Sequence, residues 1–261
     1  MKSKEFYLEV QGRFYDLLTS DRSLECAYLE YEERSSSTVK IDASWMFADQ
    51  EASVLIEEIW NATNQFCSTI RRVDAWAKIL AGIDDIQDQL DIIYEIVFPV
   101  FRLATDFPYA IKSKLTFAAV VQIREAAKIL KIKIKDFDDR SISVNKLPEL
   151  AATASGLGWG TFPKLSDVIV SLDDKDFRAF VGDYRNSYHH RVAPYVEIGQ
   201  RFSAQKGVDA KGRKFVKFGI ENARKLDSFV PPLRQQHQKC VAAAKIYKEF
   251  AEEARATREG R

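Results

Sequence analysis

The sequence contains few cysteines and histidines. Its three cysteines, Cys26, Cys67 and Cys240, lie far apart and form no Cys-x-x-Cys pair. A disulfide framework needs cysteines that can pair, and a structural zinc site needs closely spaced Cys and His ligands, so the sequence predicts neither. We therefore expect buried thiols, no bound metal and no cofactor.

Long apolar runs are missing as well. Residues 1–10 already include two lysines and two glutamates within an amphipathic pattern. A transmembrane helix needs about 20 predominantly apolar residues, and a secretory signal needs an apolar core behind a basic start. The sequence therefore predicts a cytoplasmic protein that does not cross a membrane.

Several common catalytic motifs are also absent. The chain has no Gly-x-Ser-x-Gly elbow and no His-Glu-x-x-His pair. It also has no repeat of fixed period, which argues against a solenoid scaffold. The glycine-rich stretch 156–160 lacks the Lys-Ser/Thr that a phosphate-binding loop requires, so we interpret it as a plain turn.

Charge is balanced overall but divided along the chain. The net charge is +1, whereas residues 21–100 carry 16 acidic against 6 basic residues, a balance of 6 − 16 = −10. Residues 201–261 carry 15 basic against 7 acidic residues, a balance of 15 − 7 = +8. The basic part could pack near the acidic part or bind an anion such as RNA, and the sequence does not choose between them.

Apolar residues recur every three to four positions along most of the chain, which predicts an all-α fold. We expect a single domain over 1–261, built as a bundle of about seven or eight long, mostly antiparallel helices. The expected helices cover about residues 3–19, 23–34, 49–82, 83–100, 106–130, 148–156, 174–193 and 232–256. The stretch 49–82 is either one long helix or two helices with a break near residues 61–64.

Three details of this pattern carry their own expectations. Residues 131–135 alternate in polarity but lack a partner strand, so we predict a frayed helix end or an extended linker. Residues 200–219 are polar and contain glycine, which favours an exposed loop, with a small hairpin over 214–218 as the alternative. His237 falls on the apolar stripe of the final helix, which predicts a core or interface histidine.

The predicted helix 174–193 is the part of the chain richest in reactive groups. Its apolar positions form one stripe, and Pro194 marks its end. On a helical wheel Arg185, Asn186, His189 and His190 all leave that stripe, and Asn186 and His190 are neighbours on adjacent turns. Such groups on the polar face of a helix indicate either a site or an ordinary solvated surface.

The segment Arg185-Asn186-Ser187-Tyr188-His189-His190 resembles the signature of the HEPN superfamily, an arginine and a polar residue followed by a histidine. Arg185, Asn186 and His190 match it in order. The resemblance implies a helical bundle that forms a homodimer through the motif helix. It further implies a metal-independent RNA endonuclease of toxin–antitoxin or phage-defence systems, with an antitoxin or other partner protein.

The resemblance assigns a role to each matched residue. His190 would exchange protons with the ribose 2′-hydroxyl or the leaving oxygen, Arg185 would hold the scissile phosphate, and Asn186 would orient the imidazole or the phosphate. His189 would support the site. Many HEPN proteins only bind, so the alternative is a non-catalytic dimeric module for a nucleotide, RNA or protein partner.

Asp84, Asp85 and Asp88 provide a third interpretation. They spell the Asp-Asp-x-x-Asp pattern of isoprenoid synthases, in which carboxylates hold Mg²⁺ against a diphosphate. The second metal-binding motif of those enzymes is missing. Acidic residues directly after Gly82 also have a local explanation, because they favour the positive end of the helix that follows.

Overall fold

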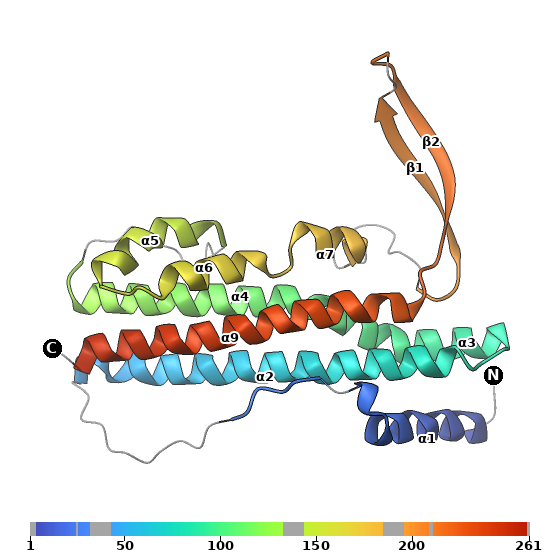
Figure 1. Ribbon diagram of the computed structural model, residues 1–261, viewed down its shortest axis with the longest axis horizontal. Helices are drawn as coiled ribbons and strands as arrows, with labels where there is room; N and C mark the ends of the chain where they lie inside the picture. Colours follow the sequence, from blue (N-terminus) through green and yellow to red (C-terminus); the bar gives the residue numbers. More distant parts are fainter. Residues whose placement is uncertain are drawn as a thin grey trace. The chain divides into compact units, whose positions relative to one another are not determined.

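The computed structural model describes residues 4–24, 26–31, 43–132, 144–184, 196–208 and 211–259. These residues are mostly helical, as predicted, with one small sheet (Figure 1). The chain divides into two compact units. Unit 1 contains residues 1–26, 69–105 and 178–233, and unit 2 contains residues 27–68, 106–177 and 234–261.

The α-helices of the described residues are α1 (Lys4–Ser20), α2 (Ala43–Leu80), α3 (Ile86–Ile92), α4 (Phe98–Ile129), α5 (Leu147–Gly156), α6 (Phe162–Ser171), α7 (Lys175–Phe180) and α9 (Val230–Glu259). A π-helical turn, Ile93–Val97, links α3 to α4. The strands are β1 (Gln200–Val208) and β2 (Lys214–Asn222).

Unit 2 is a bundle in which α2, α4 and α9 lie side by side (Figure 1). The buried ring of Phe66 on α2 contacts both Phe107 of α4 and His237 of α9, at 5.4 and 5.7 Å between ring centroids. Deeper along α4 and α9, the Gln122 amide donates to the Tyr247 hydroxyl at 2.8 Å. Both pairs of contacts follow the same order along the two helices, so α4 and α9 run parallel to each other.

The helix α4 corrects one predicted boundary. The stretch Asp106-Phe107-Pro108 was expected to begin a new helix, yet α4 continues through Pro108. A proline inside a helix removes one hydrogen bond and costs about 3 kcal/mol. The neighbouring residues Phe107 and Ile111 are both buried, and burying such side chains along one continuous helix offsets that cost.

The short helix predicted over 23–34 is also wrong in its described part. Arg22–Leu24 form a single 3₁₀ turn, and residues 26–31 are not helical. In unit 2 the side-chain amide of Asn64 on α2 bonds both backbone groups of Leu29, accepting from its N–H at 2.7 Å and donating to its carbonyl at 3.0 Å. This side chain satisfies backbone groups that a helix would have satisfied internally.

In unit 1, α1 packs against the last part of α2. Phe14 stacks on Trp76 with 4.6 Å between ring centroids, and Lys78 forms an ion pair with Asp21 at 2.6 Å. Residues 83–85 then separate α2 from α3, close to the predicted break at Gly82. The long helices predicted over 49–82 and 232–256 are confirmed as α2 and α9.

The predicted exposed loop over 200–219 is wrong, and the hairpin alternative is correct but too short. Strands β1 and β2 pair antiparallel from Gln200 opposite Asn222 to Val208 opposite Lys214. Their alternating apolar residues suit a strand, and Gly212 in the connection has φ +77°, a conformation that favours glycine. The ribbon belongs to unit 1.

None of the helices in the described residues is long and apolar enough to cross a membrane. This agrees with the absence of long apolar runs from the sequence.

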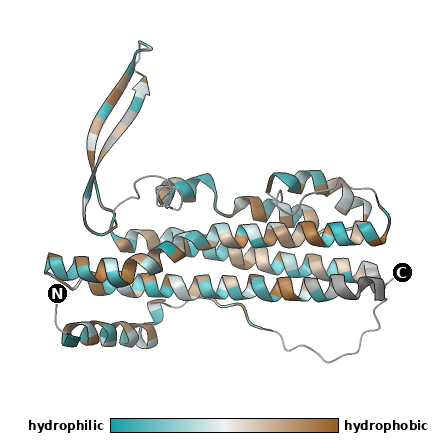
Figure 2. Ribbon diagram, turned by 180° about the vertical axis from the view of Figure 1, so that it is seen from behind, coloured by the Kyte–Doolittle hydropathy of each residue, from teal (hydrophilic) through white to brown (hydrophobic). Residues whose placement is uncertain are grey.

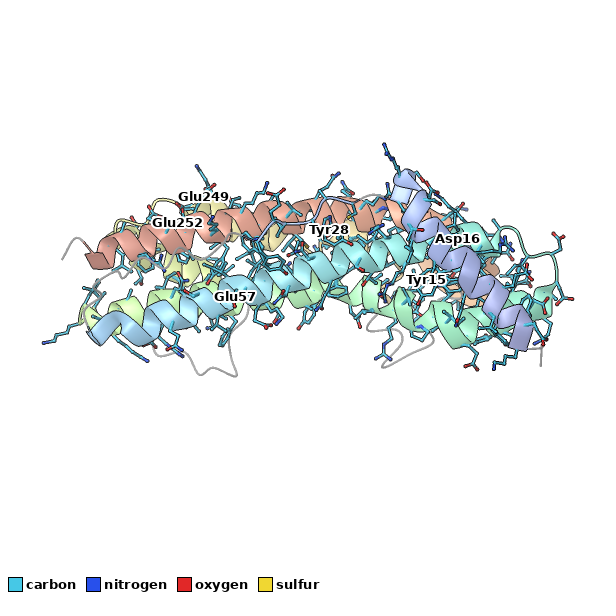
Figure 3. The ribbon with its side chains drawn as sticks, turned by 90° about the horizontal axis from the view of Figure 1, so that it is seen from below. Tyr15, Asp16, Tyr28, Glu57, Glu249 and Glu252 are labelled. Carbon is cyan, nitrogen blue, oxygen red and sulfur yellow. The ribbon has the colours of Figure 1, made fainter. Side chains whose placement is uncertain are left out.

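The buried bond between Gln122 and Tyr247 should stabilise unit 2. Tyr247→Phe leaves the Gln122 amide without this acceptor, and we expect the free energy of unfolding to fall by about 1–3 kcal/mol in urea denaturation. The control is Tyr15→Phe on α1, where Tyr15 is exposed (Figure 3). Equal stability of the two variants would contradict the assignment.

Candidate functional site

The residues predicted to form the site, Arg185, Asn186, His189 and His190, lie outside the described residues. The structure describes the chain up to Tyr184 and again from Val196. It therefore shows how the two flanks of this segment are held, and both flanks belong to unit 1.

The helix predicted over 174–193 is not continuous. Helix α7 ends at Phe180, and Gly182 and Asp183 have φ values of +69° and +47°. A glycine reaches this left-handed conformation at little cost and commonly ends a helix there. The Asp183 N–H donates to the Arg178 carbonyl at 2.6 Å, which closes the turn. The helical wheel drawn over 174–193 as one continuous helix therefore does not apply.

Asp174 holds the beginning of α7 in unit 2. One carboxylate oxygen accepts the Phe177 N–H at 2.8 Å, which caps the beginning of the helix. The other accepts from Lys239 of α9 at 2.5 Å and from the Gln236 amide at 3.4 Å. Partial burial raises the pKa of Asp174, but the bonds from Lys239 and Phe177 outweigh it and lower that pKa below its ordinary value.

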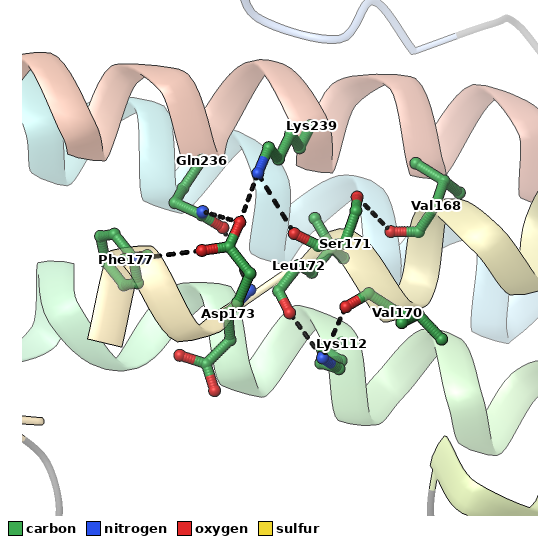
Figure 4. A network of polar contacts seen from close by, with 10 residues as sticks. Lys112, Val168, Val170, Ser171, Leu172, Asp173, Phe177, Gln236 and Lys239 are labelled. Carbon is green, nitrogen blue, oxygen red and sulfur yellow. Dashed lines mark hydrogen bonds and ion pairs between the residues drawn. The ribbon is translucent and has the colours of Figure 1, made fainter. Parts of the chain in front are cut away.

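The segment before α7 is tied to two further helices through its backbone. Lys112 of α4 donates to the carbonyls of Val170 and Leu172 at 3.1 and 2.5 Å. Lys239 also reaches the Ser171 carbonyl at 3.3 Å (Figure 4). Two lysines thus satisfy the carbonyls at the end of α6, groups that a helix leaves without internal partners.

Tyr184, the residue directly before the motif, is anchored by packing in unit 1. It is 1% exposed, and its ring lies 5.1 Å from Phe101 and 6.0 Å from Phe98, both of α4. Phe229 contacts Phe101 at 4.8 Å and Phe180 at 5.7 Å. These five rings form an aromatic cluster in unit 1, and its burial fixes where the chain enters residue 185.

Arg224 connects the two flanks. Its guanidinium lies 5.1 Å from the centre of the Phe180 ring and donates to the Phe180 carbonyl. Its own carbonyl accepts the Glu197 N–H at 2.8 Å, on the far side of the motif segment. Arg224 therefore connects Phe180 with Glu197, on either side of the stretch 185–195, a role that no sequence motif indicated.

Glu197 strengthens the second flank. Its carboxylate accepts the Leu226 N–H at 2.7 Å and forms an ion pair with Lys225 at 2.7 Å. Its side chain is only 8% exposed, although that of Lys225 is 66% exposed. Val196 beside it is buried. No sequence motif indicated this carboxylate, because its partners lie almost thirty positions away.

The three aspartates near Gly82 have different surroundings. Asp85 caps α3, accepting the Asp88 N–H at 2.9 Å, whereas Asp88 is buried and Asp84 is exposed. The capping bond agrees with the local explanation of these acidic residues. Because Asp88 is buried while Asp84 and Asp85 are exposed, the three carboxylates do not share one open surface.

His237 and two of the cysteines are buried. His237 is 3% exposed and packs against Phe66, as predicted for a core histidine. The Cys67 sulfur lies within 4.8 Å of one of its ring nitrogens. Burial raises the pKa of the Cys240 thiol, so this thiol stays protonated. Cys26 is partly exposed.

Comparisons of the chain with protein-family models, curated proteins and solved structures find no match.

The Asp174 bonds predict a pH-dependent stability. Because the folded pKa is lowered, the contribution is complete above the ordinary pKa of about 3.9 and is lost as the pH falls through the folded value. Asp174→Asn should lower the free energy of unfolding by about 1.5–3 kcal/mol at neutral pH. The difference from wild type, measured by urea denaturation, should shrink below about pH 4.

The exposed Asp167 on α6 supplies the control. Asp167→Asn should leave stability unchanged at both pH values. A deficit in Asp174→Asn that persists undiminished at low pH would show that the lost interaction is not ionic.

Proposed function

We propose that this protein is a metal-independent RNA endonuclease of the HEPN type. The observation that carries the proposal is the sequence motif Arg185-Asn186-x-x-x-His190 within a mostly helical chain. The buried aromatic cluster around Tyr184 supports it, because a reactive group needs a rigid attachment.

The proposed reaction is an internal transesterification. The ribose 2′-oxygen loses its proton and attacks the neighbouring phosphorus, while the bond to the 5′-oxygen breaks and that oxygen gains a proton. The products are a cyclic phosphate and a 5′-hydroxyl. His190 exchanges one of these protons, because its reference pKa of about 6.5 allows both protonation states near neutrality.

Arg185 and Asn186 have supporting roles in this proposal. The planar guanidinium of Arg185 offers paired donors to the phosphate oxygens and balances the negative charge that grows in the transition state. Asn186 orients the imidazole or the phosphate through its amide. His189 supports Arg185.

A symmetric homodimer through the motif segment belongs to the proposal, because two copies of that segment could together enclose Arg185, Asn186 and His190 in one cleft. A partner protein such as an antitoxin would mask the same segment. The toxin or phage-defence context rests on the resemblance alone.

Cleavage should be direct to measure. Wild-type protein should cut a single-stranded RNA in the presence of EDTA, and Arg185→Ala and His190→Ala should each lose about 100-fold or more in rate, the usual effect of removing an acid–base or charge-stabilising group. His189→Ala should retain a measurable fraction. Far-UV circular dichroism should be the same for all variants.

Other outcomes select other functions. RNA binding without cleavage, unchanged in all three variants, would identify a binding module. Magnesium-dependent turnover of an allylic diphosphate, lost in Asp84→Asn, would identify the isoprenoid chemistry. Active His190→Ala together with inactive His189→Ala would exchange the roles of the two histidines.

The dimer has its own test. Analytical ultracentrifugation at tens of micromolar should give twice the chain mass, and a cysteine introduced at Ser187 should form an intermolecular disulfide on mild oxidation. Cys26, Cys67 and Cys240 are replaced by alanine in this experiment, and the same background without the new cysteine is the control. A monomer at every concentration would contradict the dimer.

A further inference from the structure

The hairpin β1–β2 presents an unusually apolar face to solvent. Strand alternation and the pairing register put eight residues on this face. They are Phe202, Ala204, Lys206 and Val208 from β1, and Lys214, Val216, Phe218 and Ile220 from β2. We call this the Phe202 face. Figure 2 shows hydrophobic positions on both strands of the ribbon, interleaved with hydrophilic ones.

The aromatic rings on this face are highly exposed. Phe202 is 88% and Phe218 is 77% exposed, and Ile220 beside them is 59% exposed. Ala204 pairs with Phe218 and Phe202 pairs with Ile220, so Phe202 and Phe218 occupy diagonal positions, whose spacing in an antiparallel pair is about 7–8 Å. An isolated two-stranded ribbon gains little from exposing such side chains, which marks the face as a binding surface.

The charge of the ribbon indicates the chemistry of its partner. Residues 200–222 carry six basic and two acidic residues, a balance of 6 − 2 = +4. Lys206 and Lys214 lie on the Phe202 face itself, and both are exposed. Two copies of this face would bring like charges together, whereas a polyanion with apolar rings would satisfy both the lysines and the phenylalanines.

We infer that the Phe202 face binds single-stranded RNA, with bases stacked on Phe202 and Phe218 and phosphates near Lys206 and Lys214. This inference rests on the proposed function and names the surface that would hold its substrate. Unpaired bases expose flat faces that stack on aromatic side chains, whereas the bases of a duplex are already stacked on one another. The face therefore selects single strands over duplex.

The opposite face of the ribbon supplies matched controls. It carries Phe215 and Lys217, so each type of side chain occurs on both faces. The Phe215 ring covers Gly207 across the strands, where an added Cβ would meet it at 2.5 Å. Phe215 is 48% exposed, much less than either ring on the Phe202 face. Its role is to pack within the ribbon.

The experiment measures binding of the full chain to a fluorescent 2′-O-methyl oligouridine by anisotropy. This probe has no free 2′-hydroxyl, so binding is recorded without cleavage. Phe202→Leu combined with Phe218→Leu keeps the face apolar but removes the rings, and we expect affinity to fall about tenfold or more. Phe215→Leu should bind like wild type.

The lysines are tested through salt. Lys206→Gln should reduce the slope of log affinity against log salt by about 0.7, the value for one lost phosphate contact on a single strand. Lys217→Gln should leave the slope unchanged. An unlabelled RNA duplex should compete poorly with the probe.

The results separate this inference from the proposed function. If wild-type protein cleaves RNA but the double leucine variant binds and cleaves normally, the Phe202 face is not the RNA surface while the nuclease remains. Probe binding that depends on both phenylalanines, in a protein that cleaves nothing, supports this inference and contradicts the nuclease. Absence of probe binding by wild type overturns the inference, as does a double variant that loses dimerisation and keeps affinity.

Discussion

The packing of Tyr184 against Phe98 and Phe101 is the contact on which the position of the candidate site depends. Without it, the left-handed turn at Gly182 and Asp183 would leave the following residues without a fixed starting point. An aromatic side chain buries about 150–250 Å², and at about 25 cal/mol per Å² this stabilises the turn far more than one surface hydrogen bond. Arg224 then sets the other end of the same segment.

Long helices could be predicted because their evidence is repeated many times. In α2 and α9 apolar residues return every three or four positions over roughly eight to eleven turns, so a single exception does not alter the interpretation. The start of α5 at Leu147-Pro148 was similarly clear, because proline suits the first turn of a helix. These features depend on neighbours in sequence.

Features that depend on distant partners were missed. The non-helical course of residues 26–31 rests on Asn64, and the continuation of α4 through Pro108 rests on buried residues on either side of it. The hairpin was predicted only as a short alternative over 214–218, because its lysines and glycines resemble an exposed loop, and only the full pairing of β1 with β2 reveals one apolar face. For the candidate site, the sequence supplied the reactive residues 185–190, while Arg224 and Glu197 emerged only from the folded chain.

The division of the chain has a consequence for its synthesis. Each unit is assembled from three separate stretches, and residues 234–261 complete unit 2, whose first stretch begins at residue 27. Contacts such as Phe66 with His237 therefore join residues made far apart in time. Contacts between residues so far apart in sequence slow folding. During synthesis the apolar faces of α2 and α4 that contact α9 stay exposed until α9 has been made.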